Sequence, residues 1–266
     1  MLWSLISGFS DFHLFRGISQ WGLQNYTAIL SDTAALRAIG ITLLYTCITV
    51  PLKIMLAMAV AYLLHTSLKG IGIFRTLYYL PSILGSSVAA AVLWKALFRD
   101  GGVVNQLLQT VGLSPVAWLA EPDTALWVVI LLRVWEFGSP MVLMLAALQQ
   151  IPHTLLDAAR LDGAGAVSIF FRIQLPMISP VVFYSAMLQI CTALQEFNAP
   201  FIITDGGPMG STTLISLLIY RHAFSQYEMG YASALAWVLF LLTAVCVGLY
   251  LLLGKRLAFW EQEELR

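Results

Sequence analysis

The sequence predicts an all-α fold, a polytopic bundle of helices that cross a lipid bilayer. Of its 266 residues, 59% are hydrophobic and 11% are charged, whereas soluble domains are about 45–50% apolar and about 25% charged. Its longest apolar runs reach the roughly 20 residues that a helix needs to cross the bilayer core. These runs are continuous and lack the strand alternation of a membrane β-barrel. Backbone in lipid must also satisfy its own hydrogen bonds, as a helix does.

Five apolar runs are long enough to be complete spans. They cover residues 41–64, 78–97, 125–149, 178–203 and 231–253. Segment 1–40 begins with a short apolar stretch, which we interpret as the tail of a truncated first span or as an interfacial segment. The rest of that segment is expected to be extracytoplasmic or interfacial. The transmembrane domain then covers 41–253, and the charged tail 254–266 is expected to be solvated.

The distribution of Lys and Arg among the loops predicts the orientation, because cytoplasmic loops carry an excess of both. With the connector 65–77, the loop 150–177 and the C-terminal tail on one side, that side holds seven basic residues and the other side five. The seven are Lys69, Arg75, Arg160, Arg172, Lys255, Arg256 and Arg266. The five are Arg16, Arg37, Lys95, Arg99 and Arg221. The loop 150–177 and the C-terminus are therefore expected in the cytoplasm.

Composition argues against several classes of site. The three cysteines lie inside apolar runs, where cysteine behaves as a small hydrophobe, and the four histidines show no metal-ligand spacing. A formal net charge of zero gives no reason to expect nucleic acid as a partner. The phosphate-cradling pattern G-x-x-x-x-G-K-[ST] does not occur. We therefore expect no catalytic residue, no metal and no cofactor bound by this chain.

The loop 150–177 interrupts the apolar pattern with the stretch "LLDAARLDGAGAVSIFFRIQLPMISP". Pro152 should end the preceding span, because proline cannot continue a helix interior. Thr154 is then placed to cap a short helix, and Asp157 to complete an approximate capping box at its positive end.

Two glycines in the same loop predict a helical hairpin outside the membrane core. Gly163 and Gly165 should stop the first helix, and a second helical piece should cover 166–173. An ordinary solvated loop with two helical turns would also fit these residues. Because loops between packed elements are usually short, roughly 28 ordered-looking residues favour a docking element.

Four charged residues fall inside predicted spans, namely Lys53, Arg133, Glu136 and Glu196. A charge at the bilayer centre costs about 2.5–3.5 kcal/mol on insertion scales and usually faces a cavity or a partner. In antiparallel spans, Arg133 and Glu196 should lie at a similar depth, roughly 10–12 Å below the outer surface at about 1.5 Å per residue. Arg133 is therefore expected to pair with Glu196, or with Glu136 on its own helix.

A polar stripe in the fourth span is the candidate solute path. Ser185, Gln189, Thr192 and Glu196 recur at spacings of four, three and four, which is one face of a helix. We take Gln189, Thr192, Glu196 and Asn198 as possible substrate-path residues. The alternative is that these side chains only hold neighbouring helices together, at about 0.6–2 kcal/mol per hydrogen bond.

Four stretches together resemble one protein family. "DAARLDGAGAVSIFFRIQLPMISP" is similar to the cytoplasmic signature loop of ABC importer permeases, commonly Glu-Ala-Ala, three residues, Gly, and about nine residues to Leu-Pro. The stretches "LYYLPSILGSSVAAAVLWKALF", "MVLMLAALQQIP" and "FIITDGGPMGSTTLISLLIYRHAFSQYEMGYASA" resemble the carbohydrate-uptake branch, including maltose and glycerol-3-phosphate permeases. The resemblance covers nearly all of residues 20–253.

The resemblance implies a type I ABC importer permease with six spans, of which five are complete here. It also implies that the loop is a coupling-helix pair docked in a cleft of the ATPase. The residues assigned to that contact are Asp157, Ala158, Ala159, Asp162 and Gly163. Asp157 occupies the position that is usually Glu, which keeps the charge but shortens its reach.

The resemblance further implies the partners. A separate cytoplasmic ABC ATPase dimer would bind ATP. A second permease subunit, either a copy of this chain or more probably a sister chain, would complete the path in the bacterial cytoplasmic (inner) membrane, and an extracytoplasmic solute-binding protein would deliver a sugar, polyol or sugar phosphate. A secondary, ion-coupled transporter is the alternative; it would show internal repeats with broken helices and leave the loop unexplained. An intramembrane enzyme would need a nucleophile with a base, or a metal cluster, at one depth.

Overall fold

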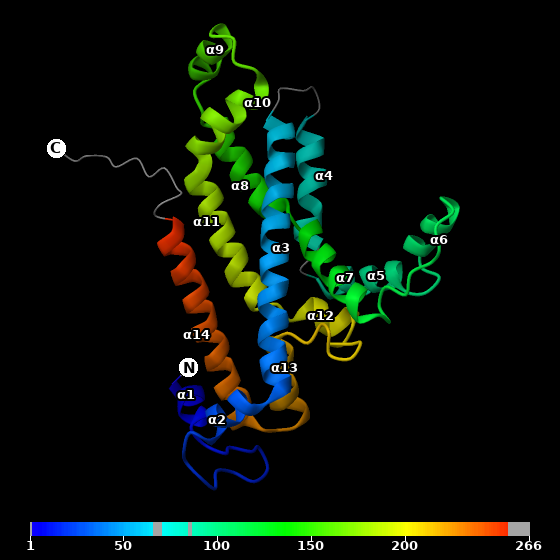
Figure 1. Cartoon of the computed structure of the whole chain (residues 1–266), viewed down its shortest axis with the longest axis vertical. Coiled ribbons are helices and arrows are strands. Elements are labelled where there is room, and N and C mark those ends of the chain that lie inside the picture. Colours follow the sequence, from blue (N-terminus) through cyan, green and yellow to red (C-terminus); the bar gives the residue numbers. More distant parts are fainter. Residues whose placement is uncertain (1, 66–70, 85–86, 255–266) are drawn as a thin grey trace, which may run out of the picture.

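The structure is a computed structural model that describes residues 2–65, 71–84 and 87–254, and it is built of helices (Figure 1). In chain order they are α1 (Leu2–Gly8), α2 (Gln24–Ser31), α3 (Thr33–His65), α4 (Ile71–Leu84), α5 (Val88–Phe98), α6 (Val103–Thr110), α7 (Pro122–Trp135), α8 (Gly138–Gln149), α9 (His153–Leu161), α10 (Ala166–Ile169), the π-helix η1 (Phe170–Gln174), α11 (Leu175–Leu194), α12 (Asn198–Ile203), α13 (Ile215–Tyr220), the π-helix η2 (Arg221–Ser225) and α14 (Met229–Gly254).

Within the described residues, four helical segments are long and apolar enough to cross a membrane. They are Thr33–His65, Pro122–Gln149, Ala166–Leu194 and Met229–Gly254. The predicted spans 41–64 and 231–253 lie within the first and the last of these. A fifth span exists only if the bent pair of helices Thr76–Ile83 and Val88–Thr110 is counted as one.

The span predicted over 78–97 is wrong as a single straight helix. Its two halves belong to α4 and α5, and the helices Thr76–Ile83 and Val88–Thr110 are inclined by 99°. Ser87 explains where the second half begins, because its side chain accepts a hydrogen bond from the Ala90 backbone N–H and caps α5. Continuous apolarity does not reveal a capped helix start inside a hydrophobic run.

The span predicted over 178–203 is displaced toward the N-terminus. The helical run begins at Ala166, passes through η1 and α11 without a gap, and ends at Leu194. The separate helical piece predicted over 166–173 is therefore the first part of the span itself. Beyond Leu194 the chain breaks and restarts as the short helix α12.

Two further local predictions need correction. The span 125–149 is divided into α7 and α8 by Glu136 and Phe137. In the loop, Pro152 rather than Thr154 occupies the N-cap of α9, and no side chain caps that helix. Proline is well suited to a helix start because its missing N–H would find no partner there, so the capping box predicted for Asp157 is absent.

The helix α3 is the central element of the bundle. It packs against α8, α11 and α7, and Tyr45, Val50 and Ala57 on it are buried. By contrast, α14 exposes large apolar side chains such as Phe240, Leu241 and Val245. Such an apolar exposed face is what a helix presents to lipid.

The N-terminal segment packs at the end of the bundle where α14 begins (Figure 1). The helix α1 contacts α14, and the Tyr231 hydroxyl on α14 donates a hydrogen bond of 2.7 Å to Asp32 Oδ2 at the start of α3. This hydrogen bond holds the pKa of the Asp32 carboxyl below its usual range, with burial acting in the opposite direction. The junction of α2 and α3 is thereby fastened to the last span.

Gly138 offers a test of the close contact between α4 and α8. A Cβ at this position would lie 2.7 Å from Ser82 Oγ and 3.0 Å from the Tyr78 carbonyl oxygen. We expect Gly138→Ala to lower the free energy of unfolding by about 1–3 kcal/mol, the usual cost of overpacking. Thermal unfolding of the purified protein would measure this.

The matched control for this change is Gly40→Ala. Gly40 is also helical, but nothing lies within 4 Å of its Cβ position, so its stability should stay equal or rise slightly, since alanine favours helix. Equal melting temperatures for the two variants would contradict the packing of α4 against α8.

Candidate functional site

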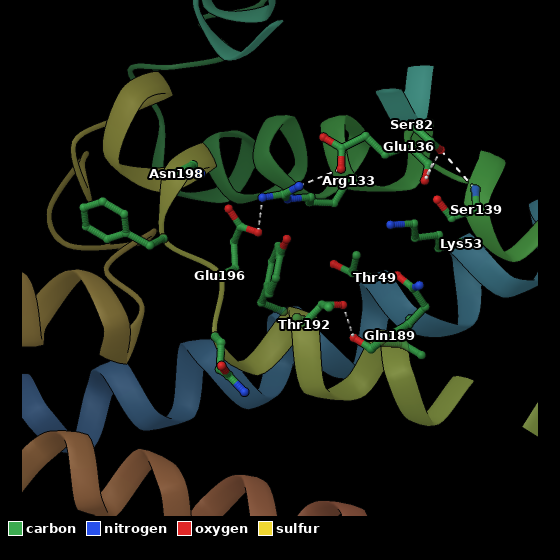
Figure 2. A pocket seen from close by; sticks show the side chains of 15 residues that line it. Thr49, Lys53, Ser82, Arg133, Glu136, Ser139, Gln189, Thr192, Glu196 and Asn198 are labelled. Carbon is green, nitrogen blue, oxygen red and sulfur yellow. Dashed lines mark hydrogen bonds and ion pairs between the residues drawn. The ribbon is translucent and has the colours of Figure 1, made fainter. Parts of the chain in front are cut away.

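A polar cavity of about 460 Å³ lies between α3, the α7–α8 segment and the α11–α12 segment (Figure 2). Its walls carry hydroxyl, amide and charged side chains, although the helices that form it are mainly apolar. The polar and charged lining residues are Tyr45, Thr49, Lys53, Ser82, Arg133, Glu136, Ser139, Gln189, Thr192, Gln195, Glu196 and Asn198.

The first helix break, between α7 and α8, is held by a serine from another helix. Ser82 Oγ on α4 donates a hydrogen bond to the Glu136 carbonyl oxygen at 3.0 Å and accepts one from the Ser139 N–H at 3.1 Å. Non-helical backbone at membrane depth is tolerated only where such partners satisfy it. The break also directs the Glu136 side chain toward the cavity.

The second helix break, between α11 and α12, is held in a similar way. The Ser216 hydroxyl on α13 donates a hydrogen bond to the Glu196 carbonyl oxygen. Glu196 Oε1 accepts a hydrogen bond from the Ala199 N–H at 2.9 Å and so acts as a cap for α12. At the other end of α12, Lys95 Nζ donates to the Ile202 carbonyl oxygen at 3.1 Å.

Arg133 joins the two breaks electrostatically. Its Nη1 donates a hydrogen bond of 2.6 Å to Glu136 Oε2, and its Nη2 forms an ion pair with Glu196 Oε2 (Figure 2). The two pairings that the sequence offered as alternatives are therefore both present. Glu136 and Glu196 are only 6% and 5% exposed, so each carboxylate depends on this guanidinium for its counter-charge.

All four predicted substrate-path residues, Gln189, Thr192, Glu196 and Asn198, line the cavity. Ser185, the first member of the predicted stripe, is buried but lies outside the lining. The Thr192 hydroxyl donates to the Gln189 carbonyl oxygen of its own helix, so part of the stripe satisfies itself.

The sequence interpretation missed the wall that α3 contributes. Tyr45, Thr49 and Lys53 recur every four residues and all line the cavity. That spacing is one helix face, and it was present in the sequence, but only the charge of Lys53 was noticed. Across residues 2–65, 71–84 and 87–254, no group of three or more His, Cys, Asp or Glu side chains is placed to hold a metal ion.

The predicted coupling residues lie on α9 and the turn after it, at the end of the bundle opposite to α1 and α2 (Figure 1). Asp157 pairs with Arg160 on the same helix at 2.9 Å, and both side chains are largely exposed. Ala158 and Asp162 are exposed, whereas Ala159 packs toward the core. Such an exposed ion pair contributes little stability, so these charges are available to a partner.

Gly163 forms the turn after α9 with φ +81°. This left-handed conformation favours glycine, as the sequence suggested. Beside it, Leu161 is 89% exposed on the last turn of α9, and Val167 is also exposed. Sequence reasoning had not singled out these two apolar side chains.

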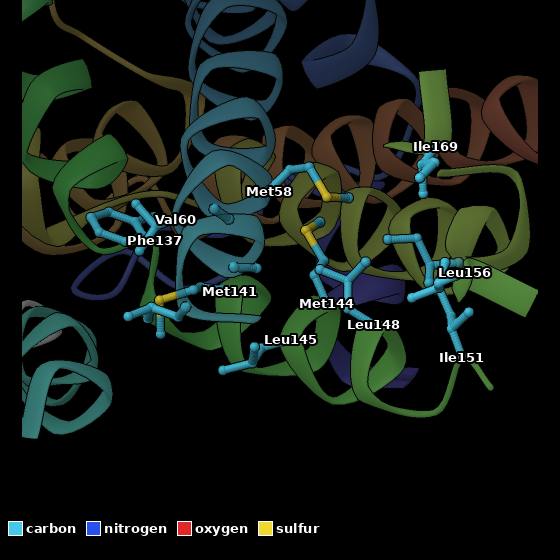
Figure 3. Close-up of a cluster of buried hydrophobic side chains, with 14 residues drawn as sticks. Met58, Val60, Phe137, Met141, Met144, Leu145, Leu148, Ile151, Leu156 and Ile169 are labelled. Carbon is cyan, nitrogen blue, oxygen red and sulfur yellow. The ribbon is translucent and has the colours of Figure 1, made fainter. Parts of the chain in front are cut away.

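A buried cluster anchors the loop to the bundle (Figure 3). Leu156 on α9 and Ile169 on α10 are buried with Met58 on α3 and with Met144 and Leu148 on α8. The loop therefore has one face packed into the core and one face exposed. A displacement of the exposed face would be felt by α3 and α8, which lead toward the cavity.

Arg133 should be the most sensitive position in the cavity. Arg133→Met leaves two buried carboxylates without a counter-charge, and we expect it to lower the free energy of unfolding by about 3–5 kcal/mol. The triple change Arg133→Met with Glu136→Gln and Glu196→Gln should recover most of this loss, because no charge then stays buried and the amide oxygen at 196 can still cap α12. Thermal unfolding in detergent measures both. A triple variant as unstable as the single one would show that charge is not the cause.

The sequence also matches known proteins along most of its length. Residues 26–259 match the family described as "Binding-protein-dependent transport system inner membrane component". The chain is 40% identical over 266 residues to the "Probable ABC transporter permease protein YesP" of Bacillus subtilis (strain 168), which covers 98% of this chain and 85% of YesP. It is 35% identical over 231 residues to the "Sulfoquinovosyl glycerol transport system permease protein SmoG" of Agrobacterium fabrum, covering 86% of this chain and 75% of SmoG.

A solved structure shares the fold. It is a bacterial alginate ABC transporter in complex with an alginate pentasaccharide-bound periplasmic protein. The TM-score is 0.78 at 24% sequence identity, over 90% of this chain and 84% of that chain. The chain therefore belongs to the family of binding-protein-dependent transport system inner membrane components, the membrane permease subunits of ABC importers, in which a separate ATPase partner hydrolyses ATP.

Proposed function

We propose that this permease carries a sugar or a related polyol or sugar phosphate through the polar cavity between α3, α7–α8 and α11–α12. The observation that carries the proposal is the cavity itself, whose hydroxyl, amide and charged lining suits a solute rich in hydroxyl groups. Its volume of about 460 Å³ lies in the range of about 300–1,000 Å³ that small-molecule sites occupy. The names of SmoG and of the alginate transporter support a saccharide as the solute.

In this proposal Gln189, Thr192, Glu196 and Asn198 contact the solute. Arg133, with Glu136 and Glu196, keeps the two helix breaks in register, so that the cavity has a defined shape. The ion pair thus has a structural part, while the polar stripe has a binding part. An ion-coupled mechanism is not proposed, because the family match and the relatives are binding-protein-dependent systems.

We further propose that the exposed face of α9 receives the ATPase dimer through Asp157, Ala158, Asp162 and Gly163, with Ala159 as the packed side of the same contact. Residues Ala166–Leu194 form one helical run from this loop to the cavity, which supports a direct mechanical path for rigid-body rearrangement. ATP is bound by the ATPase and not by this chain.

The remaining partners follow from the same proposal. A second permease subunit, which we expect to be a sister chain, completes the path, and an extracytoplasmic solute-binding protein delivers the solute. The loop bearing α9 then lies in the cytoplasm. The end of α14 at Gly254 lies toward that end of the molecule (Figure 1), which supports a cytoplasmic C-terminus; the tail 255–266 falls outside the described residues.

Reconstitution tests the function. The chain would be expressed with its permease partner, ATPase and binding protein, and incorporated into proteoliposomes. Uptake of radiolabelled maltose, lactose, trehalose, uronate oligosaccharides and glycerol 3-phosphate is measured with and without ATP. We expect ATP-dependent uptake of at least one solute that also requires the binding protein. Uptake driven by an ion gradient without the ATPase would contradict the proposal.

Leu161 gives the sharpest test of the docking face. Because its side chain is 89% exposed, Leu161→Glu should leave the thermal stability of the isolated chain unchanged. It should reduce recovery of the ATPase with the tagged permease by about tenfold, as expected when an apolar anchor is replaced by a charge at an interface.

Leu113→Glu is the matched control, since Leu113 is exposed on the loop after α6, away from α9. It should retain the ATPase fully. Undiminished recovery with Leu161→Glu would show that α9 is not the docking face.

A further inference from the structure

Lys53 is buried in the bundle without a partner. Its side chain extends from the middle of α3 into the cavity (Figure 2), and the residue is only 9% exposed. In the described part of the chain, no hydrogen bond or ion pair joins its ammonium to another residue. An ammonium in this environment is costly and marks a functional position when nothing structural satisfies it.

Glu136 presents a matching free acceptor. Its Oε2 is occupied by Arg133, but its Oε1 is buried and has no hydrogen-bond partner. Glu136 and Lys53 line the same cavity, together with the hydroxyls of Tyr45 and Thr49. The cavity therefore holds one unused strong donor and one unused strong acceptor in the same wall region, outside the polar stripe of α11.

The charges of the cavity explain why these two groups stay unused. Arg133 is shared between Glu136 and Glu196, which leaves this group of three with a formal charge of −1. The Lys53 charge balances it at a distance without forming a contact pair. A direct Lys53–Glu136 ion pair would satisfy both groups and close this part of the cavity, but the structure does not contain one.

We propose that Lys53 and the free Oε1 of Glu136 bind neighbouring hydroxyl groups of the transported solute, an inference that rests on the proposed function and deepens it. The Lys53 ammonium donates a hydrogen bond to one hydroxyl oxygen, and Glu136 Oε1 accepts a hydrogen bond from a second hydroxyl. A pair of adjacent hydroxyls can serve both groups at once, because each hydroxyl is donor and acceptor. The ligand class is thus a solute with a vicinal diol, as in a saccharide ring.

The alternative is that Lys53 is only a structural counter-charge for Glu136, and stability separates the two roles. For the binding role, Lys53→Met should leave the apparent melting temperature of the solute-free transporter unchanged or raise it, since an unsatisfied buried charge is removed. For the structural role, the same change should lower it. This measurement uses the complete purified transporter and needs no solute.

Transport supplies the second measurement, in the proteoliposomes described above. With the first solute of that panel that the unmodified transporter takes up, Lys53→Met and Glu136→Gln should each reduce uptake at low solute by about tenfold or more, the usual effect of losing a hydrogen bond to a charged group. The double variant should be at least as impaired as either single one. Thr46→Val is the control, because Thr46 is buried on α3 outside the cavity lining and its hydroxyl only donates to the Thr42 carbonyl oxygen; its uptake should stay within twofold.

Three results would overturn the inference. They are a lower melting temperature for Lys53→Met, uptake by Lys53→Met equal to that of Thr46→Val, and restored uptake in the double variant, which would mean that the two charges merely balance each other. A transporter whose unmodified form takes up no saccharide with ATP would instead overturn the proposed function. The melting temperature would then still decide between the two roles of Lys53.

Discussion

Two helices of this permease stop inside the membrane bundle, and the rest of the site depends on how their freed backbone groups are satisfied. Water is not available there to hydrogen-bond the exposed N–H and C=O groups. Ser82 and Ser216, each from a different helix, bind the carbonyl oxygens of Glu136 and Glu196. The two glutamates then share Arg133. One guanidinium and two serine hydroxyls thus hold four helical segments in place.

These breaks also create the cavity. A continuous helix directs its side chains outward around its axis, and its backbone stays shielded. Where α7 and α11 end, the chain can turn a carboxylate inward and leave room for a solute. The same residues therefore close the backbone hydrogen bonds and shape the path, which is why Glu196 both caps α12 and lines the cavity. Polar groups of this kind would be too costly on a face turned to lipid.

The loop bearing α9 is fixed to the bundle on one side only. Leu156 and Ile169 are buried among side chains of α3 and α8, whereas Leu161 and the Asp157–Arg160 pair face outward. The helical run from Ala166 to Leu194 contains the π-helix η1 and two prolines, Pro176 and Pro180. Such features loosen the regular hydrogen bonding of a helix, so the run combines continuity with local adaptability between the loop and the cavity.

The sequence by itself determined the all-α membrane class, the position of the first and last spans, the coupling loop with its glycine turn, and the partners of Arg133. These follow from composition, apolar run length and spacing, which act locally along the chain. Only the tertiary structure decided where helices stop within apolar runs, at Leu194 and before Val88, and which of two carboxylates Arg133 binds, which is both. It also decided that Tyr45, Thr49 and Lys53 of α3 face the same cavity as α11. The physical reason is that a helix break in a membrane is stable only where another helix supplies the missing hydrogen bonds, and such partners, 54 residues apart for Ser82 and Glu136, leave no mark in any local pattern.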